Sequence, residues 1–129
     1  MHVASGAAAG AALRSRPAAV GAGLLLHLFA DLVPHQDIAS LRFEVGSGVL
    51  SLLTVAARRG PTHPATIGAL ASSIPDLEHI VRLPRPGGRK LFPSHRVRGW
   101  HKAGGFPAWL QLLAAGALIG SVVAARPRR

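Results

Sequence analysis

Residues 17–33 read PAAVGAGLLLHLFADLV, an apolar run that starts with a proline and is followed at position 34 by a second one. Proline fits the first turn of a helix and disfavours helical backbone in the residue before it, so this stretch predicts one helix with defined ends. Two polar side chains, His27 and Asp31, lie inside the run. They stand four residues apart and therefore share one helical face, close enough to bind a single ion or to hydrogen-bond to each other.

Three further apolar segments follow along the chain. They cover residues 43–57, 63–74 and 104–125, and prolines, glycines or arginines follow each of them. Hydrophobic residues make up 49% of the chain and charged residues only 16%, which is more apolar than most soluble domains. The last segment has the roughly 20 apolar residues that cross a bilayer. The sequence therefore predicts an all-α fold, a small multi-pass bundle of about four apolar helices in a cell membrane. A soluble, alanine-rich helical bundle is the alternative.

The length of 129 residues suits one domain. Residues 17–125 are expected to form this single helical membrane domain. Residues 1–16 are small and weakly patterned and are expected to be a mobile N-terminal tail, while residues 126–129 form a basic C-terminal tail. The N-terminal region is similar to a signal peptide, but no convincing small-residue cleavage site follows its apolar run, so we expect it to be retained.

The chain is strongly basic and has no cysteine. Fifteen Lys and Arg residues stand against five acids, which gives a net charge of +10. Because the basic residues bracket the apolar runs, they favour membrane lipid headgroups as the partner. Nucleic acid is not expected, since only Trp100 is interleaved among arginines and aromatic residues make up 5% of the chain. The absence of cysteine excludes disulfides and thiolate metal sites.

The few acidic residues cluster with histidines. Four of the five lie within four positions of a histidine, in HLFADLVPHQD (27–37) and IPDLEH (74–79). A further segment with two histidines is SHRVRGWHK (94–102). In an antiparallel bundle, the ends of the first and third apolar helices and the start of the fourth emerge on the same side. The three segments are therefore predicted to meet at one end of the bundle.

These residue types predict a divalent-metal site. The candidate metal ligands carry imidazole or carboxylate groups: His27, Asp31, His35, His79, His95 and His101. Asp76 or Glu78 is the candidate general base. Arg96 or Arg98 would hold a substrate phosphate, since the guanidinium fork bonds two oxygens at once. Mixed nitrogen and oxygen ligands suit Zn²⁺, with Mn²⁺ and Fe²⁺ as further candidates.

The same segments resemble the signatures of the LexA-binding, inner-membrane-associated hydrolase family of bacteria. IPDLEH is similar to its PDxDH element, SHRVRGWH to its HRGxTHS element and HLFAD to its H-x3-D helix. A looser similarity exists to zinc-dependent phospholipases C. The chain departs from the pattern where Glu78 replaces an Asp, where His95 and His101 are six positions apart instead of five, and in placing the H-x3-D helix first. The resemblance implies an integral membrane protein with a divalent-metal site and hydrolase chemistry.

The sequence thus predicts a membrane-embedded metal-dependent hydrolase that acts on a small-molecule or lipid phosphoester. In a non-enzymatic alternative, the same His and Asp clusters brace the helices of a membrane protein with a structural metal, or transfer ions. Separate changes of Asp76 and Glu78 distinguish the two, because a general base can be lost while the metal is retained.

Overall fold

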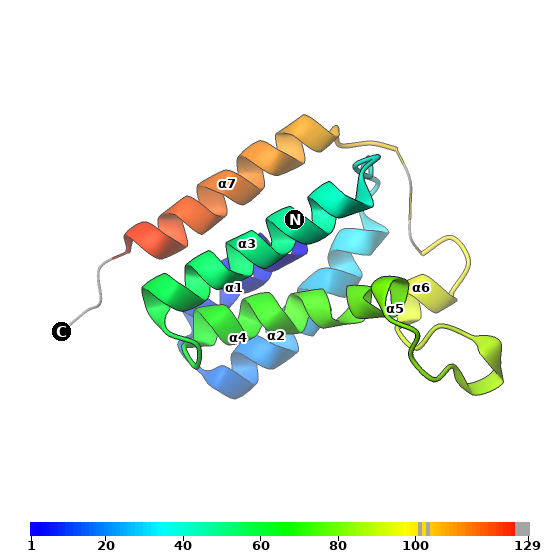
Figure 1. Ribbon diagram of the computed structural model, residues 1–129, viewed down its shortest axis with the longest axis horizontal. Coiled ribbons are helices and arrows are strands. Elements are labelled where there is room, and N and C mark those ends of the chain that lie inside the picture. The colour runs from blue at the N-terminus through cyan, green and yellow to red at the C-terminus, as the bar shows by residue number, and fades with distance from the viewer. Residues whose placement is uncertain (101, 103, 126–129) are drawn as a thin grey trace.

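The computed structural model describes residues 1–100, 102 and 104–125, and this part of the chain is all-helical apart from an isolated bridge between His35 and Phe106. Long helices form the body of the fold, and short helical turns and loops connect them (Figure 1). The helices are α1 (His2–Leu13), α2 (Arg16–Leu32), α3 (Leu41–Arg59), α4 (Pro64–Ser73), η1 (Ile74–Asp76), α5 (Leu77–Ile80), η2 (Pro86–Gly88), α6 (Pro93–Arg96) and α7 (Ala108–Ala124).

Helix α1 contacts α2, α3, α4 and α7, and its most extensive contact is with α4. Two glycines allow this approach. A Cβ atom on Gly6 would overlap the Gly68 carbonyl of α4, and one on Gly10 would overlap the Pro64 carbonyl. The structure therefore differs from the expectation of a mobile tail at residues 1–16. Small residues give little hydrophobic signal in the sequence, yet they let two helices pack backbone against backbone.

The predicted membrane bundle is wrong. Within the described ranges, none of the helices combines the length and the apolar character that crossing a membrane takes. Helix α7 has 17 residues because Pro107 delays its start, and at 1.5 Å per residue it is about 26 Å long against a hydrocarbon core of about 30 Å. Helix α3 carries Glu44 in its first turn and arginines in its last. The same finding contradicts the predicted multi-pass location in a cell membrane.

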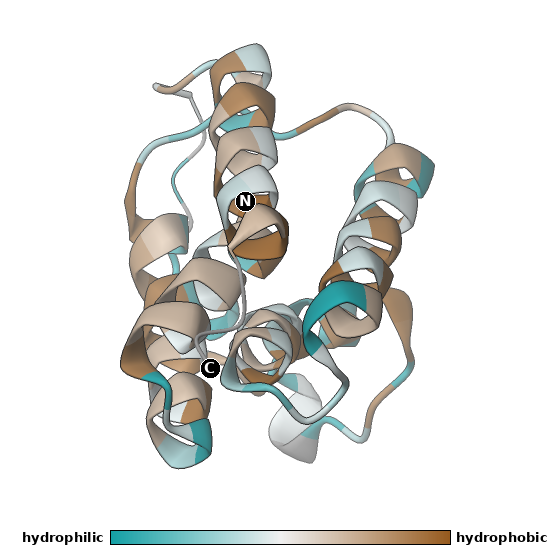
Figure 2. Ribbon diagram, turned by 90° about the vertical axis from the view of Figure 1, so that its left-hand side faces the viewer, coloured by the Kyte–Doolittle hydropathy of each residue, from teal (hydrophilic) through white to brown (hydrophobic). Residues whose placement is uncertain are grey.

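Small side chains dominate the hydrophobic core. Its buried members are Ala7, Val55, Ala65, Ala69 and Val122. Figure 2 shows hydrophobic residues interspersed with near-neutral ones along the helices, in keeping with a core of this kind. Larger apolar side chains lie on the surface of α3 and α7, where Leu50 is 67% and Trp109 62% exposed. The fold is therefore held together mainly by close helix contacts and less by a core of large side chains.

Local sequence signals set the ends of the helices that carry the candidate site. The Ser15 hydroxyl caps α2 by accepting a hydrogen bond from the Ala18 N–H at 3.4 Å, and α2 ends at Leu32, as the proline at position 34 predicts. Pro75 lies in η1, where α4 gives way to the short helix α5. These breaks bring the last turns of α2, the η1–α5 segment and α6 to one end of the molecule (Figure 1).

Candidate metal centre

Three candidate ligand atoms, from two helices that are far apart in the sequence, form a nearly equilateral triangle. His27 Nε2 and Asp31 Oδ2, both on α2, are 3.2 Å apart. His95 Nε2, on α6, lies 3.3 Å from His27 Nε2 and 3.3 Å from Asp31 Oδ2. Asp76 Oδ1 approaches this triangle from η1 and is 3.8 Å from each of the two Nε2 atoms. These side chains include a group that could hold a metal ion, His27, Asp31 and His95.

Hydrogen bonds on the outer side of both rings set the direction of the ligand atoms. His27 Nδ1 is 2.8 Å from the Ser72 carbonyl oxygen, and His95 Nδ1 is 2.6 Å from Glu78 Oε1. Since both of these oxygens are acceptors, each Nδ1 must carry the proton, and in the neutral ring each Nε2 then presents a lone pair. The Ser94 hydroxyl donates to Asp31 Oδ2 and orients that carboxylate. Two imidazole lone pairs and a carboxylate oxygen therefore converge on one point, where only a cation or added protons can satisfy them.

Burial and the neighbouring groups shift the pKa values in this cluster. Without a metal ion, the Nε2 atoms of His27 and His95 can carry the added protons and donate them to Asp31. These hydrogen bonds and that from Ser94 hold the pKa of Asp31 well below its usual value, although burial acts to raise it. Burial acts to lower the pKa of His95, yet its hydrogen bonds to Asp31 and Glu78 outweigh this effect and raise it. The Asp31 carboxylate thus stays ionised in the buried cluster, as a metal ligand must.

The two remaining carboxylates differ in their surroundings. Burial raises the pKa of Asp76, although the nearby histidines oppose the rise, and its side chain is 41% exposed. Glu78 is buried behind His95, and burial acts to raise its pKa. Hydrogen bonds from the Leu91 N–H and from His95 lower it instead. Of the two candidate bases in the sequence, only Asp76 points a carboxylate oxygen toward the triangle, while Glu78 holds the ring of a ligand.

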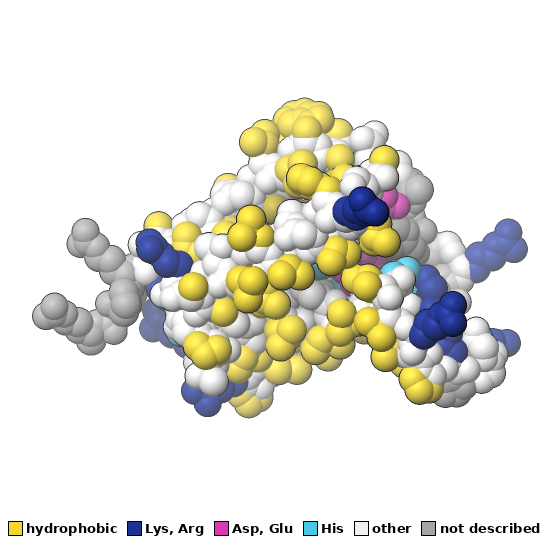
Figure 3. Space-filling view, in the orientation of Figure 1, with side chains coloured by type: hydrophobic (Ala, Val, Ile, Leu, Met, Phe, Trp, Pro, Cys, Tyr) yellow, Lys and Arg dark blue, Asp and Glu magenta, His cyan; other side chains and the backbone are white. Residues whose placement is uncertain are grey.

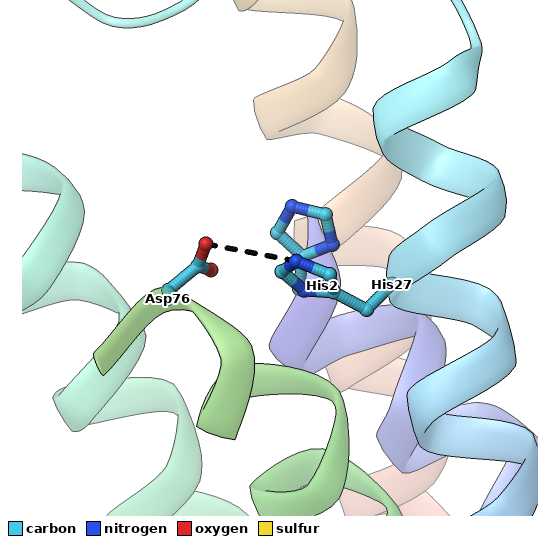
Figure 4. A group of neighbouring side chains, drawn as sticks. All are labelled: His2, His27 and Asp76. Carbon is cyan, nitrogen blue, oxygen red and sulfur yellow. Dashed lines mark ion pairs between the residues drawn. The ribbon is translucent and has the colours of Figure 1, made fainter. Parts of the chain in front are cut away.

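His2 is a site residue that the sequence reasoning missed. Its Nε2 lies 3.5 Å from Asp31 Oδ1, and its ring centroid is 4.1 Å from that of His27. Figure 4 shows the two rings side by side with Asp76 pointing toward them, and these three residues form a second group that could hold a metal. Burial, with a further contribution from His27, lowers the pKa of His2 to about 3. The signal in the sequence is His2 followed by glycines at positions 6 and 10, which pack α1 against α4.

The structure brings some predicted residues to the cluster and places others apart. His79 joins Asp76 and His95 in a third group that could hold a metal. His35 lies beyond the end of α2, where its ring contacts the Val33 carbonyl oxygen at 2.8 Å and Asp37 at 3.5 Å, and it belongs to none of the groups found among the described residues. His101 lies outside the described residues.

The two predicted phosphate-binding arginines also differ in position. Arg98 lines a cavity beside His95, in contrast to Arg96, which is exposed and is not among the residues that line it.

Comparisons of the chain with protein-family models, curated proteins and solved structures gave no match.

Proposed function

We propose that this protein is a metal-dependent hydrolase whose divalent ion, Zn²⁺, is bound by His27, Asp31 and His95. The observation that carries the proposal is the triangle of ligand atoms with edges of 3.2–3.3 Å. Zinc bonds of about 2.0–2.1 Å at tetrahedral angles put neighbouring ligand atoms about 3.3 Å apart. An octahedral ion with bonds of about 2.1 Å would need about 3.0 Å between adjacent ligands, so the triangle favours a tetrahedral ion.

The outer contacts of the ligands support the same assignment. Metal-binding histidines almost always donate their second ring N–H to a carboxylate or a backbone carbonyl. Here His27 has the Ser72 carbonyl and His95 has the Glu78 carboxylate. Both of these contacts fix the tautomer in which Nε2 is the ligand atom.

An open fourth position favours catalysis over a purely structural ion. Structural zinc sites have four protein ligands, whereas catalytic sites have three and leave one position for water or substrate. Asp76 Oδ1, at 3.8 Å from both Nε2 atoms, is farther than a tetrahedral ligand would be and is partly exposed. A divalent ion here would supply a Lewis acid and lower the pKa of water. Asp76 Oδ1 would then accept the proton of the attacking water.

Metal analysis of the purified full-length chain, together with hydrolysis of 4-nitrophenyl phosphate and its bis ester, tests the proposal. We expect about one equivalent of zinc, and loss of the metal in His27→Gln and His95→Gln. His35→Gln is the matched control, because His35 lies outside the ligand groups, and it should keep the metal. Asp76→Asn should keep the metal and lose hydrolysis.

Three results would contradict the proposal in different ways. A chain without stoichiometric divalent metal would refute the site itself. Loss of metal from Asp76→Asn would make Asp76 a fourth ligand of a structural ion. Equal loss of metal from His35→Gln and His27→Gln would show that histidines bind the ion without regard to position.

A further inference from the structure

A cavity of about 280 Å³ opens beside the proposed metal centre. His95 and Ser94 form the side of the cavity next to the centre, and Lys90, Arg98 and His79 line it as well. None of the described residues that line it is acidic. Figure 3 shows histidine and basic side chains next to each other at the end of the molecule where α5 and α6 lie. The cavity thus joins a ligand of the proposed ion to two side chains that carry positive charge.

The charges of the centre show why these cations matter. Asp31, Asp76 and Glu78 carry three negative charges when ionised, and a divalent ion would neutralise two of them. The centre alone would therefore be negative and would repel a phosphate group. Lys90 and Arg98 reverse the sign of the charge on the side where the cavity opens. Without such cations the metal centre would be a poor site for any anionic substrate.

The two cations flank helix α6 in the sequence, Lys90 before it and Arg98 after it. The N–H of Leu91 donates to Glu78 Oε2 at 2.7 Å, so the backbone next to Lys90 is held by the same carboxylate that orients His95. The Lys90 ammonium lies 3.1 Å from His79 Nδ1. Arg98 lies two residues beyond the end of helix α6. A lysine point charge and an arginine fork that line one small cavity suit a compact group with several anionic oxygens.

We propose that this cavity binds the phosphate of a small phosphomonoester, with Lys90 and Arg98 as the residues that recognise it. The inference rests on the proposed hydrolase function and adds its substrate class. A monoester dianion has an oxygen for each of the two cations and one for the metal side, whereas a diester carries a single charge and a second bulky substituent. The volume of about 280 Å³ lies below the usual range for drug-sized ligands and favours a small substrate.

Binding of inorganic phosphate to the zinc-loaded protein, followed by isothermal titration calorimetry, tests the assignment. Lys90→Gln and Arg98→Gln should each weaken binding by about tenfold or more, since each removes a charge-assisted hydrogen bond. Arg89→Gln and Arg96→Gln are the matched controls, because these arginines are neighbours in sequence that do not line the cavity, and each should change binding less than about twofold. The zinc content should be the same in all five proteins.

Kinetics and metal content separate the failure of this inference from the failure of the proposed function. For 4-nitrophenyl phosphate, the two cavity variants should raise KM more than they lower kcat. The parent protein should have a higher kcat/KM for 4-nitrophenyl phosphate than for the bis ester. If zinc is bound but phosphate binding is unchanged in Lys90→Gln and Arg98→Gln, the cavity assignment is overturned and the metal site stands. A preference for the bis ester would overturn the monoester assignment. Absence of zinc from the parent would overturn both proposals.

Discussion

The buried carboxylate of Glu78 accepts two hydrogen bonds, from His95 Nδ1 at 2.6 Å and from the Leu91 N–H at 2.7 Å. Glutamine has one carbonyl oxygen and one NH₂ group, so Glu78→Gln can accept only one of these bonds and turns a donor toward the other. Because Glu78 is 3% exposed, water cannot replace the lost bond. A hydrogen bond to a charged group contributes about 1.5–3 kcal/mol. We therefore expect metal affinity to fall by about 10–100-fold, the range seen for partners of ligating histidines.

Competition with a chromophoric chelator at neutral pH measures this loss. Glu44→Gln is the control, since Glu44, on α3, accepts a hydrogen bond from the Ile38 N–H and belongs to none of the ligand groups among the described residues. Its metal affinity should match that of the parent. If Glu78→Gln binds zinc as tightly as the parent and loses only hydrolysis, Glu78 is the general base and its role in positioning His95 is refuted.

Two further predictions concern the stability of the fold. Gly6→Ala should destabilise the protein by about 1–3 kcal/mol, because its methyl group would overlap the Gly68 carbonyl, whereas Gly46→Ala, which meets nothing within 4 Å, should stabilise α3 by up to about 1 kcal/mol. Urea denaturation compares the two, and equal effects would contradict the close contact of α1 with α4. In the presence of a chelator, stability should be highest near pH 6.5, the ordinary pKa of histidine. The raised pKa of His95 makes its contribution complete below pH 6.5 and lost as pH rises from there through the raised pKa. The pKa of His2, lowered to about 3, makes stability fall from pH 6.5 toward pH 3. Denaturation midpoints that continue to rise above pH 6.5 would contradict this assignment.

The sequence predicts the first long helix well because strong local signals set its ends. A proline opens the run at 17–33 and another follows it, and α2 spans Arg16–Leu32. The spacing of His27 and Asp31 then follows from helix geometry, and their side chains meet. Their third partner, His95, was among the candidate ligands, but the sequence did not distinguish it from His79 and His101. The distance between His27 and His95 depends on how α6 folds back across 68 positions, which no local pattern specifies.

The composition led to the membrane prediction for a physical reason. Alanine and glycine count as apolar in a composition, but in this fold they serve close packing, as at Gly6 and Ala69, and they bury little surface each. The same property concealed α1, whose residues show no contrast between an apolar and a polar face. Likewise, the different roles of Asp76 and Glu78 arise from the helical backbone that follows Pro75, in which side chains two positions apart point about 200° from each other around the axis.

The core of small side chains has a consequence for how the protein folds. His27 and Asp31 lie one turn apart on α2, so the proposed metal ion could bind to this helix before the rest of the chain is in place. His95, 68 positions away from His27, can join only afterwards, and the ion would then close a long loop as a cross-link does. A chain with little large-residue core depends more on such a cross-link than one with an extensive core. Its folding yield in the cell is then expected to follow the supply of metal during synthesis.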